Sequence, residues 1–412
     1  IAADGKRIAA GSIQKPSVPP HSSRIVAIEY APIKQEAGVE YFISFRTIIR
    51  EPEPFKPKGY VIAMDQYPLG APLPVTLTTT AVFPPLAVTE EGPVLSVEGK
   101  DFRISFDKTS GILSSYQWKG TQLIERGMEP NFWRPPTDND FGNRMQITSG
   151  VWKKAGENRV LTSFTSKKIN SSEVKVTAVF DLPDVRSQFK VEYAVLGNGE
   201  VVVENNFMTR EGNLPELPRF GVKMRLPKAF EKIEYLGRGP EENYCDRKTA
   251  AHVGVYRSTV TEQYFPYVSP QENGNKTDVR WIAFTNEQGN GLMVVGMPLL
   301  SLSALHYTIE DLTQESRGTR HTIDLQKKDF VALNLDLKQR GVGGDDSWGA
   351  KPHSQYCLLG VSYSFQFRLS PVTRGDDLSV YYPCDPVDLR QFLSADHDRG
   401  LGRRVSQAEP AF

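Results

Sequence analysis

The chain has 412 residues, which is long enough for two or three domains with separate hydrophobic cores. Its 49 basic residues balance its 49 acidic residues, so charge gives no reason to expect a nucleic acid or an anionic membrane as a partner. No apolar run reaches the length of a transmembrane helix. Cys245, Cys357 and Cys384 form no C-x-x-C pair, which argues against a zinc ribbon or a disulfide framework.

The N-terminal residues show no signal-peptide pattern, because Asp4, Lys6 and Arg7 interrupt a weak apolar run. Isolated thiols are typical of a reducing compartment, and we expect the protein to be cytoplasmic. A periplasmic location is the alternative, because the chain does not begin with Met and its native N-terminus is expected to be missing. The six histidines are scattered, so no metal cluster is predicted.

Residues 1–86 carry short predicted strands between proline-bearing loops. We expect a hairpin over 1–13 with its turn at Asp4-Gly5, and strands at 24–30, 41–49 and 60–67. No helical period is present, which favours a small β-sandwich. Only five or six strands can be found, fewer than the seven or so of a complete sandwich of this kind. Residues 87–93 are polar and are predicted to be a linker.

From residue 94 onward, apolar side chains recur at every second position, first at Phe102, Ile104 and Phe106. The same alternation is found at 112–118, 174–180, 189–203, 220–226, 331–337 and 359–369, with hairpins at 198–199 and 286–291. Period two over many long strands predicts two large packed antiparallel sheets, which we assign to residues 94–371. The pattern then stops, and residues 372–412 are predicted to be a partly disordered tail of unknown role, with a helical hint at 387–393.

Residues 131–144 read N-F-W-R-P-P-T-D-N-D-F-G-N-R. Pro135 and Pro136 fix φ and remove two backbone donors, and the short polar side chains that follow favour turns. We expect this stretch to be neither helix nor strand. Because loops of this kind often carry function, we predict that it shapes a site; the alternative is a well-packed crossover loop.

Three later stretches complete a recognisable series. They are G-R-G-P-E-E-N-Y-C-D-R at 237–247, S-P-Q-E-N-G-N-K-T-D-V-R-W at 269–281 and G-V-G-G-D-D-S-W-G at 341–349. With residues 131–144 they resemble, in the same order, the C-terminal part of the large lac-type β-galactosidases of glycoside hydrolase family two. The resemblance implies an all-β chain: the end of an immunoglobulin-like sandwich over 1–86, then a galactose mutarotase-like supersandwich over 94–371.

The resemblance also implies where catalysis takes place. Retaining glycosidases need two carboxylates about 5–5.5 Å apart. In the resembled enzymes both lie on a (β/α)₈ barrel, and this chain shows no alternating strand–helix pattern. We therefore expect no catalytic residue, metal or cofactor here; the full enzyme's metal sites would lie on the missing barrel. Asn286-Glu287 echoes an Asn-Glu pair of such barrels, but it lies in a glycine-rich turn and is not interpreted as catalytic.

What the resemblance assigns to this chain is a wall of the sugar site. Trp348 corresponds to the family's substrate-stacking residue, and an indole offers a flat apolar face to a pyranose. The alternative is a core Trp under a loop. The residues expected to hold this loop are Gly344, Asp345, Asp346 and Ser347. The residues that correspond to the start of a mobile active-site loop are Asp138, Asn139, Asp140 and Gly142.

Two further polar clusters could contact carbohydrate, although we favour ion pairs and turns that fix the strands. The first comprises Glu241, Tyr244, Asp246 and Arg247, and the second comprises Gln271, Glu272, Asn273, Asn275, Asp278 and Arg280.

The predicted function is therefore the non-catalytic C-terminal portion of a β-galactosidase that acts on terminal β-galactosides such as lactose. The expected partners are the galactoside, the missing N-terminal and barrel domains, and further copies of the chain. A free-standing sugar-binding module is one alternative. An aldose 1-epimerase is another; it needs a His acid and a Glu base, for which His252, His306 and His321 are available.

Overall fold

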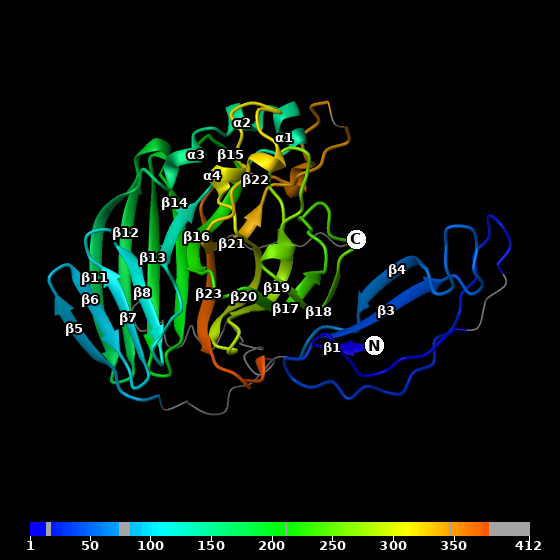
Figure 1. The fold of residues 1–412 in the computed structure, drawn as a ribbon, viewed down its shortest axis with the longest axis horizontal. Helices are drawn as coiled ribbons and strands as arrows, with labels where there is room; N and C mark the ends of the chain where they lie inside the picture. Colours follow the sequence, from blue (N-terminus) through cyan, green and yellow to red (C-terminus); the bar gives the residue numbers. More distant parts are fainter. Residues whose placement is uncertain (14–17, 74–82, 211, 347, 379–412) are drawn as a thin grey trace.

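The computed structural model describes residues 1–13, 18–73, 83–210, 212–346 and 348–378, and its regular secondary structure consists mainly of antiparallel strands (Figure 1). The predicted all-β class is therefore confirmed. The predicted helix at 387–393 and Cys384 lie outside the described residues.

The N-terminal region forms a four-stranded sheet in the order β2-β1-β3-β4. Its strands are β1 (Ala2–Ala3), β2 (Lys6–Arg7), β3 (Tyr41–Ile48) and β4 (Val61–Pro68). The hairpin at Asp4-Gly5 and the strands near 41–49 and 60–67 are confirmed. The predicted strand at 24–30 is wrong: these residues pair with no neighbour and are exposed. Four strands, rather than five or six, are present among the described residues before Leu86.

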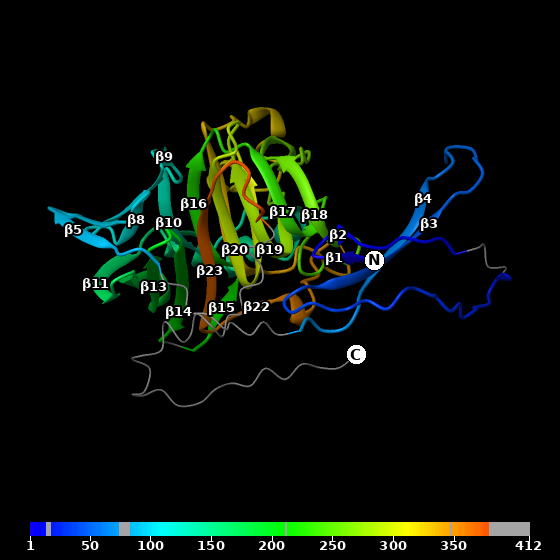
Figure 2. The ribbon, with the colours of Figure 1, turned by 90° about the horizontal axis from the view of Figure 1, so that it is seen from below.

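This sheet lies beside β17 and β18 of the large sheet, as Figures 1 and 2 both show. Two polar contacts join them. The Arg280 Nε lies 2.6 Å from the Glu40 carboxylate. The Gln66 amide donates to the Val253 carbonyl at 2.9 Å and accepts from the Val253 N–H at 2.7 Å. The amide therefore satisfies both backbone groups of an edge strand.

A five-stranded sheet follows in the order β5-β6-β7-β8-β9. Its strands are β5 (Ala87–Glu91), β6 (Val94–Glu98), β7 (Phe102–Asp107), β8 (Ile112–Trp118) and β9 (Thr121–Gln122). The predicted linker at 87–93 is therefore a hairpin, in which Val88 pairs with Val97 and Gly92 turns at φ +58°. Strand β5 is polar because it is an exposed edge. The domain boundaries at 86, 93 and 371 stay predictions.

A twelve-stranded sheet forms the rest. It runs β10-β16-β21-β20-β23-β14-β13-β12-β11, with β19, β17 and β18 branching from β20. The strands are β10 (Arg126–Asn131), β11 (Val160–Asn170), β12 (Glu173–Leu182), β13 (Ser187–Leu196), β14 (Val201–Thr209), β16 (Arg219–Pro227), β17 (Lys232–Gly239), β18 (His252–Thr259), β19 (Lys276–Thr285), β20 (Gly291–Leu305), β21 (Phe330–Gln339) and β23 (Tyr363–Val372). The single strand predicted at 359–369 is split, because β22 (Leu358–Gly360) pairs with β15 (Leu214–Leu217) instead.

The main core lies between the five-stranded and the twelve-stranded sheets. Ile104 and Phe106 of β7 join one apolar cluster with Val176 and Tyr193 of β12 and β13, and the Phe106 and Tyr193 rings lie 5.1 Å apart. The prediction of packed antiparallel sheets is thus confirmed. Side chains of β19 alternate between the main core and a second apolar cluster on the opposite face of the sheet. Trp281 belongs to this second cluster with Leu236, Met293 and Val372. Phe42 packs against the second cluster.

Short helices cluster at one end of the sheets (Figure 1). They are α1 (Asp138–Gly142), α2 (Met145–Thr148), α3 (Trp152–Ala155) and α4 (Ile309–Leu312). Residues 131–144 are therefore not wholly irregular, because Asn131 ends β10 and α1 forms. The Thr137 hydroxyl accepts from the Asp140 N–H, and the Asp140 carboxylate accepts from the Thr137 N–H. This capping box starts α1 directly after the two prolines.

Phe132 provides a test of this packing. It is 1% exposed, and its ring lies within 6.2 Å of the rings of Trp152, Phe189, Phe207 and Phe220. We expect Phe132→Ala to lower the free energy of unfolding by about 3–5 kcal/mol, measured by denaturant titration. The control is Phe55→Ala, because Phe55 is 99% exposed. Equal stability of the two variants would contradict this account of the core.

Candidate functional site

A buried guanidinium joins the two stretches that the sequence singles out. Arg134 Nη2 donates to both carboxylate oxygens of Asp140, at 2.9 and 3.0 Å, and to the Gly341 carbonyl at 2.9 Å. Its Nη1 donates to the Arg340 carbonyl. Arg340 Nη1 lies 3.0 Å from the same Asp140 carboxylate, and all three side chains are at most 1% exposed. Helix α1 and the segment that begins at Gly341 are therefore held together by one charged network.

The glycine-rich segment after Gly341 is fixed by further hydrogen bonds. The Asp246 carboxylate accepts from the Val342 N–H at 3.1 Å and from the Gly343 N–H at 2.8 Å. The Asn139 amide of α1 donates to the Val342 carbonyl at 3.2 Å. Asn139 and Asp246 come from distant parts of the chain, so two separate elements hold the segment by hydrogen bonds.

Trp348 stands at the tip of this segment and is 89% exposed. The alternative that it is a core residue is therefore wrong for this chain. One Asp346 carboxylate oxygen accepts from the N–H groups of Trp348, Gly349 and Ala350 at 2.8, 3.1 and 3.2 Å. These hydrogen bonds, that of Trp348 first, lower the pKa of Asp346. They fix the backbone that carries the indole, while the indole itself stays open to solvent.

The predicted loop residues divide into different environments. Asp345 pairs with His353 at 2.8 Å on the surface, and Ser347 lies outside the described residues. A Cβ added to Gly349 would lie 3.2 Å from the Gly142 carbonyl, so the tips of the two stretches are adjacent. Asp140 is buried in the Arg134 network, whereas Asp138 is half exposed and lies 2.9 Å from Arg317.

Most members of the two polar clusters form ion pairs or hydrogen bonds within the chain, as the favoured interpretation expects. Glu242, which the sequence analysis did not name, accepts from the Gly274 N–H at 2.7 Å, from Arg247 at 2.6 Å and from the Tyr267 hydroxyl. Asp278 pairs with Arg238 at 2.5 Å and Lys248 at 3.0 Å, and Glu272 pairs with buried Arg219 at 2.7 Å. We find no sequence signal that would have separated Glu242 from Glu241 beside it.

The other candidate groups are engaged elsewhere. His306 Nε2 lies 2.6 Å from Glu231, and its Nδ1 lies 2.8 Å from the Phe330 carbonyl. Glu287 is exposed and pairs with Lys232 at 2.7 Å. Burial raises the pKa of the Cys245 thiol to about 11, which keeps it protonated and unreactive near neutral pH.

The described residues were compared with what a metal site and a membrane-spanning helix require. Across the described residues, no three His, Cys, Asp or Glu side chains form a group that could hold a metal ion. The same residues contain no helix that is long and apolar enough to cross a membrane.

Asp140 provides the test of the charged network. Asp140→Asn leaves Arg134 and Arg340 buried without their shared carboxylate, and we expect a loss of about 3–5 kcal/mol of stability, measured by thermal and denaturant unfolding. Asp138→Asn is the matched control two positions away; its exposed ion pair contributes no more than about 1 kcal/mol. An unchanged melting temperature for Asp140→Asn would show that the network does not hold the loops.

Comparison with solved structures gives distant likenesses only. A putative aldose 1-epimerase from Escherichia coli K12 aligns with a TM-score of 0.35 and 9% identity, covering 70% of this chain and all of the other. An aldose epimerase homologue from Caenorhabditis elegans gives a TM-score of 0.36 and 9% identity, covering 70% of this chain and 99% of the other. Likenesses at this level say nothing about activity.

Comparison of sequences is far more specific. The family described as "Beta galactosidase small chain" matches residues 98–369, and the family described as "Beta-galactosidase, domain 4" matches residues 1–70. The β-galactosidase of Priestia megaterium is 34% identical over 86% of this chain, and that of Streptococcus thermophilus is 31% identical over 82%. The chain covers 34% and 32% of these relatives, about a third of their length. Because the small-chain family model matches more than half of the chain, the chain belongs to the β-galactosidase small-chain family.

Proposed function

We propose that this chain is the non-catalytic C-terminal portion of a β-galactosidase that hydrolyses terminal β-galactosides such as lactose, and that Trp348 stacks on the substrate. The observation that carries the proposal is an indole that is 89% exposed on a backbone held by Asp346. Burying the apolar face of an exposed indole against the C–H face of a pyranose is favourable. A fixed backbone lowers the entropy lost when the sugar binds.

The carboxylates around Trp348 support a non-catalytic role. One oxygen of Asp346 accepts three backbone hydrogen bonds, Asp345 pairs with His353, and Asp140 is buried between two arginines. Hydrolysis requires one carboxylate that protonates the leaving group and a second that attacks the sugar or activates water. Engaged or buried side chains are poorly suited to either task. The proposal therefore assigns both to domains outside this chain.

The proposal also covers partners, cofactors and compartment. The partners are the N-terminal and barrel domains of the same enzyme, the galactoside, and other copies of the enzyme in a homo-oligomer. This portion needs no cofactor or metal of its own, and the compartment is the cytoplasm. Asp138, Asn139 and Gly142 form the neighbouring part of the site, because the tip of α1 adjoins Gly349.

The first test uses the isolated chain. We expect purified residues 1–412 to show no turnover of a chromogenic β-galactoside, because the two carboxylates needed for the reaction are supplied elsewhere. The full-length enzyme, assayed at equal molar concentration, is the positive control. Turnover that co-elutes with the folded chain through size exclusion would overturn the assignment.

The second test uses Trp348→Ala in the full-length enzyme. We expect galactoside binding to weaken by about 1–3 kcal/mol, seen as a raised KM or inhibitor constant, because the stacking face is lost. Trp348→Phe should retain part of the affinity, since it keeps an aromatic face. Both variants should melt like the wild-type enzyme, because the indole is exposed. A large fall in melting temperature with unchanged binding would assign Trp348 a structural role instead.

A free-standing sugar-binding module is the second candidate, and the same exposed Trp348 supports it. The two candidates differ in what the gene encodes upstream of Ile1. A barrel with paired glutamates there favours the enzyme portion, and its absence favours the module.

A further inference from the structure

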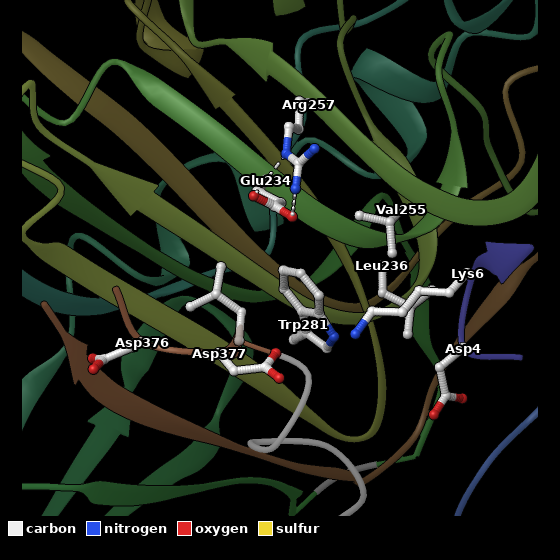
Figure 3. Close-up of a pocket in the computed structure, with 10 residues that line it drawn as sticks. Asp4, Lys6, Glu234, Leu236, Val255, Arg257, Trp281, Asp376 and Asp377 are labelled. Carbon is white, nitrogen blue, oxygen red and sulfur yellow. Dashed lines mark hydrogen bonds and ion pairs between the residues drawn. The ribbon is translucent and has the colours of Figure 1, made fainter. Parts of the chain in front are cut away.

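A cavity of about 430 Å³ lies on the face of the large sheet that is turned away from the main core. Three separate parts of the chain line it, as Figure 3 shows: the turn of the β1–β2 hairpin, the strands β17, β18 and β19, and the segment after β23. None of its lining residues belongs to the Trp348 segment or to α1. It is therefore a separate feature of the molecule.

The floor of the cavity is apolar with one open donor. Leu236, Val255 and Trp281 supply the apolar surface. Trp281 is 3% exposed, yet its indole N–H finds no hydrogen-bond partner in the part of the chain that the structure describes. In Figure 3 the indole nitrogen lies on the edge of the ring turned toward Asp4 and Lys6. The indole nitrogen is not one of the fully buried atoms that lack a partner, so the donor reaches the space of the cavity and is available to a ligand there.

The rim is charged and held in place. Glu234 and Arg257 form a bidentate pair at 2.8 and 2.9 Å. One Asp4 oxygen accepts from the Glu40 N–H at 2.8 Å, and one Asp376 oxygen accepts from the Thr373 N–H at 2.7 Å. In each of these two aspartates the second oxygen accepts no hydrogen bond from the described residues. Asp4 and Asp376 therefore each keep one acceptor oxygen at the rim.

The hairpin turn cannot move freely away from the strands. Gly5 has φ +76°, and a Cβ added to it would lie 2.7 Å from the Val255 backbone nitrogen. Only a glycine fits this close approach, so the turn that carries Asp4 is seated directly on β18. The acceptor of Asp4 is thus positioned by packing as well as by its hydrogen bond.

We propose that this cavity binds a neutral saccharide of one or two rings, as a second carbohydrate site distinct from Trp348. Its volume lies in the range of small-molecule sites. The apolar floor suits the C–H face of a pyranose, and the indole donor and carboxylate acceptors suit its hydroxyl groups. Four lining carboxylates face two lining cations, so an anionic ligand is disfavoured.

The experiment measures saccharide binding to the whole chain by saturation-transfer NMR, using glucose, galactose and lactose. Trp348→Ala is introduced first, so that the proposed stacking site is absent. We expect saturable binding to this variant by one of these sugars, with a dissociation constant on the order of 1–10 mM for a ligand of this size. Glucuronate, which adds a negative charge, should bind more weakly than glucose.

Trp281→Phe in the same background removes the indole donor and keeps a ring, and we expect affinity to fall about five- to tenfold. Trp118→Phe is the matched control, because it makes the same change outside the cavity. If Trp281→Phe lowers the melting temperature, Val255→Phe replaces it, since a ring at this half-buried wall fills the space. Binding that survives Val255→Phe or a stable Trp281→Phe, or no saturable binding by the Trp348→Ala chain, overturns the proposal. Equal binding by wild type and Trp348→Ala would instead count against the stacking role of Trp348 and leave this site standing.

Discussion

The fold at the candidate site depends on one buried carboxylate shared by two arginines. Charges removed from water are tolerated only when they are paired and hydrogen-bonded, and Asp140 provides both for Arg134 and Arg340. The two arginines lie about two hundred positions apart in sequence. Arg134 precedes α1 and Arg340 precedes the glycine-rich segment, so the shared carboxylate joins two different loops. The cost of burying the arginines makes alternative positions of the two loops unfavourable. Trp348 therefore extends from a fixed base although it is itself exposed.

The strands were predictable because successive side chains of a strand point to opposite faces of the sheet. Burial of one face makes apolar residues recur at every second position, and a single sequence shows this recurrence. Phe102, Ile104 and Phe106 alternate with polar neighbours, and the structure buries all three in the main core. The same signal was weak where only an edge is formed. Strand β5 is polar and pairs on one side, so it resembled a linker. Residues 24–30 have strand composition but no partner, and composition alone does not create a ladder.

The site was predictable in part and for a different reason. The resemblance located Trp348 and the segment around Asp138, but it could not assign their environments. Asp140 was predicted to belong to the start of an active-site loop, and its burial between Arg134 and Arg340 could not be foreseen, because Arg340 lies two hundred residues away in sequence. Arg134 was overlooked for the same reason, since a single sequence does not show which distant carboxylate an arginine meets. The cavity around Trp281 depends on three separate segments and left no local signal.

Several carboxylates of this chain position its backbone. Asp246, Asp346 and Glu242 all accept backbone N–H groups of loops that carry few apolar residues. A loop that cannot bury apolar area is ordered most effectively by charge-assisted hydrogen bonds of this kind. Loops ordered in this way can hold an exposed apolar side chain such as Trp348 on a fixed backbone, which is what the proposed stacking role requires.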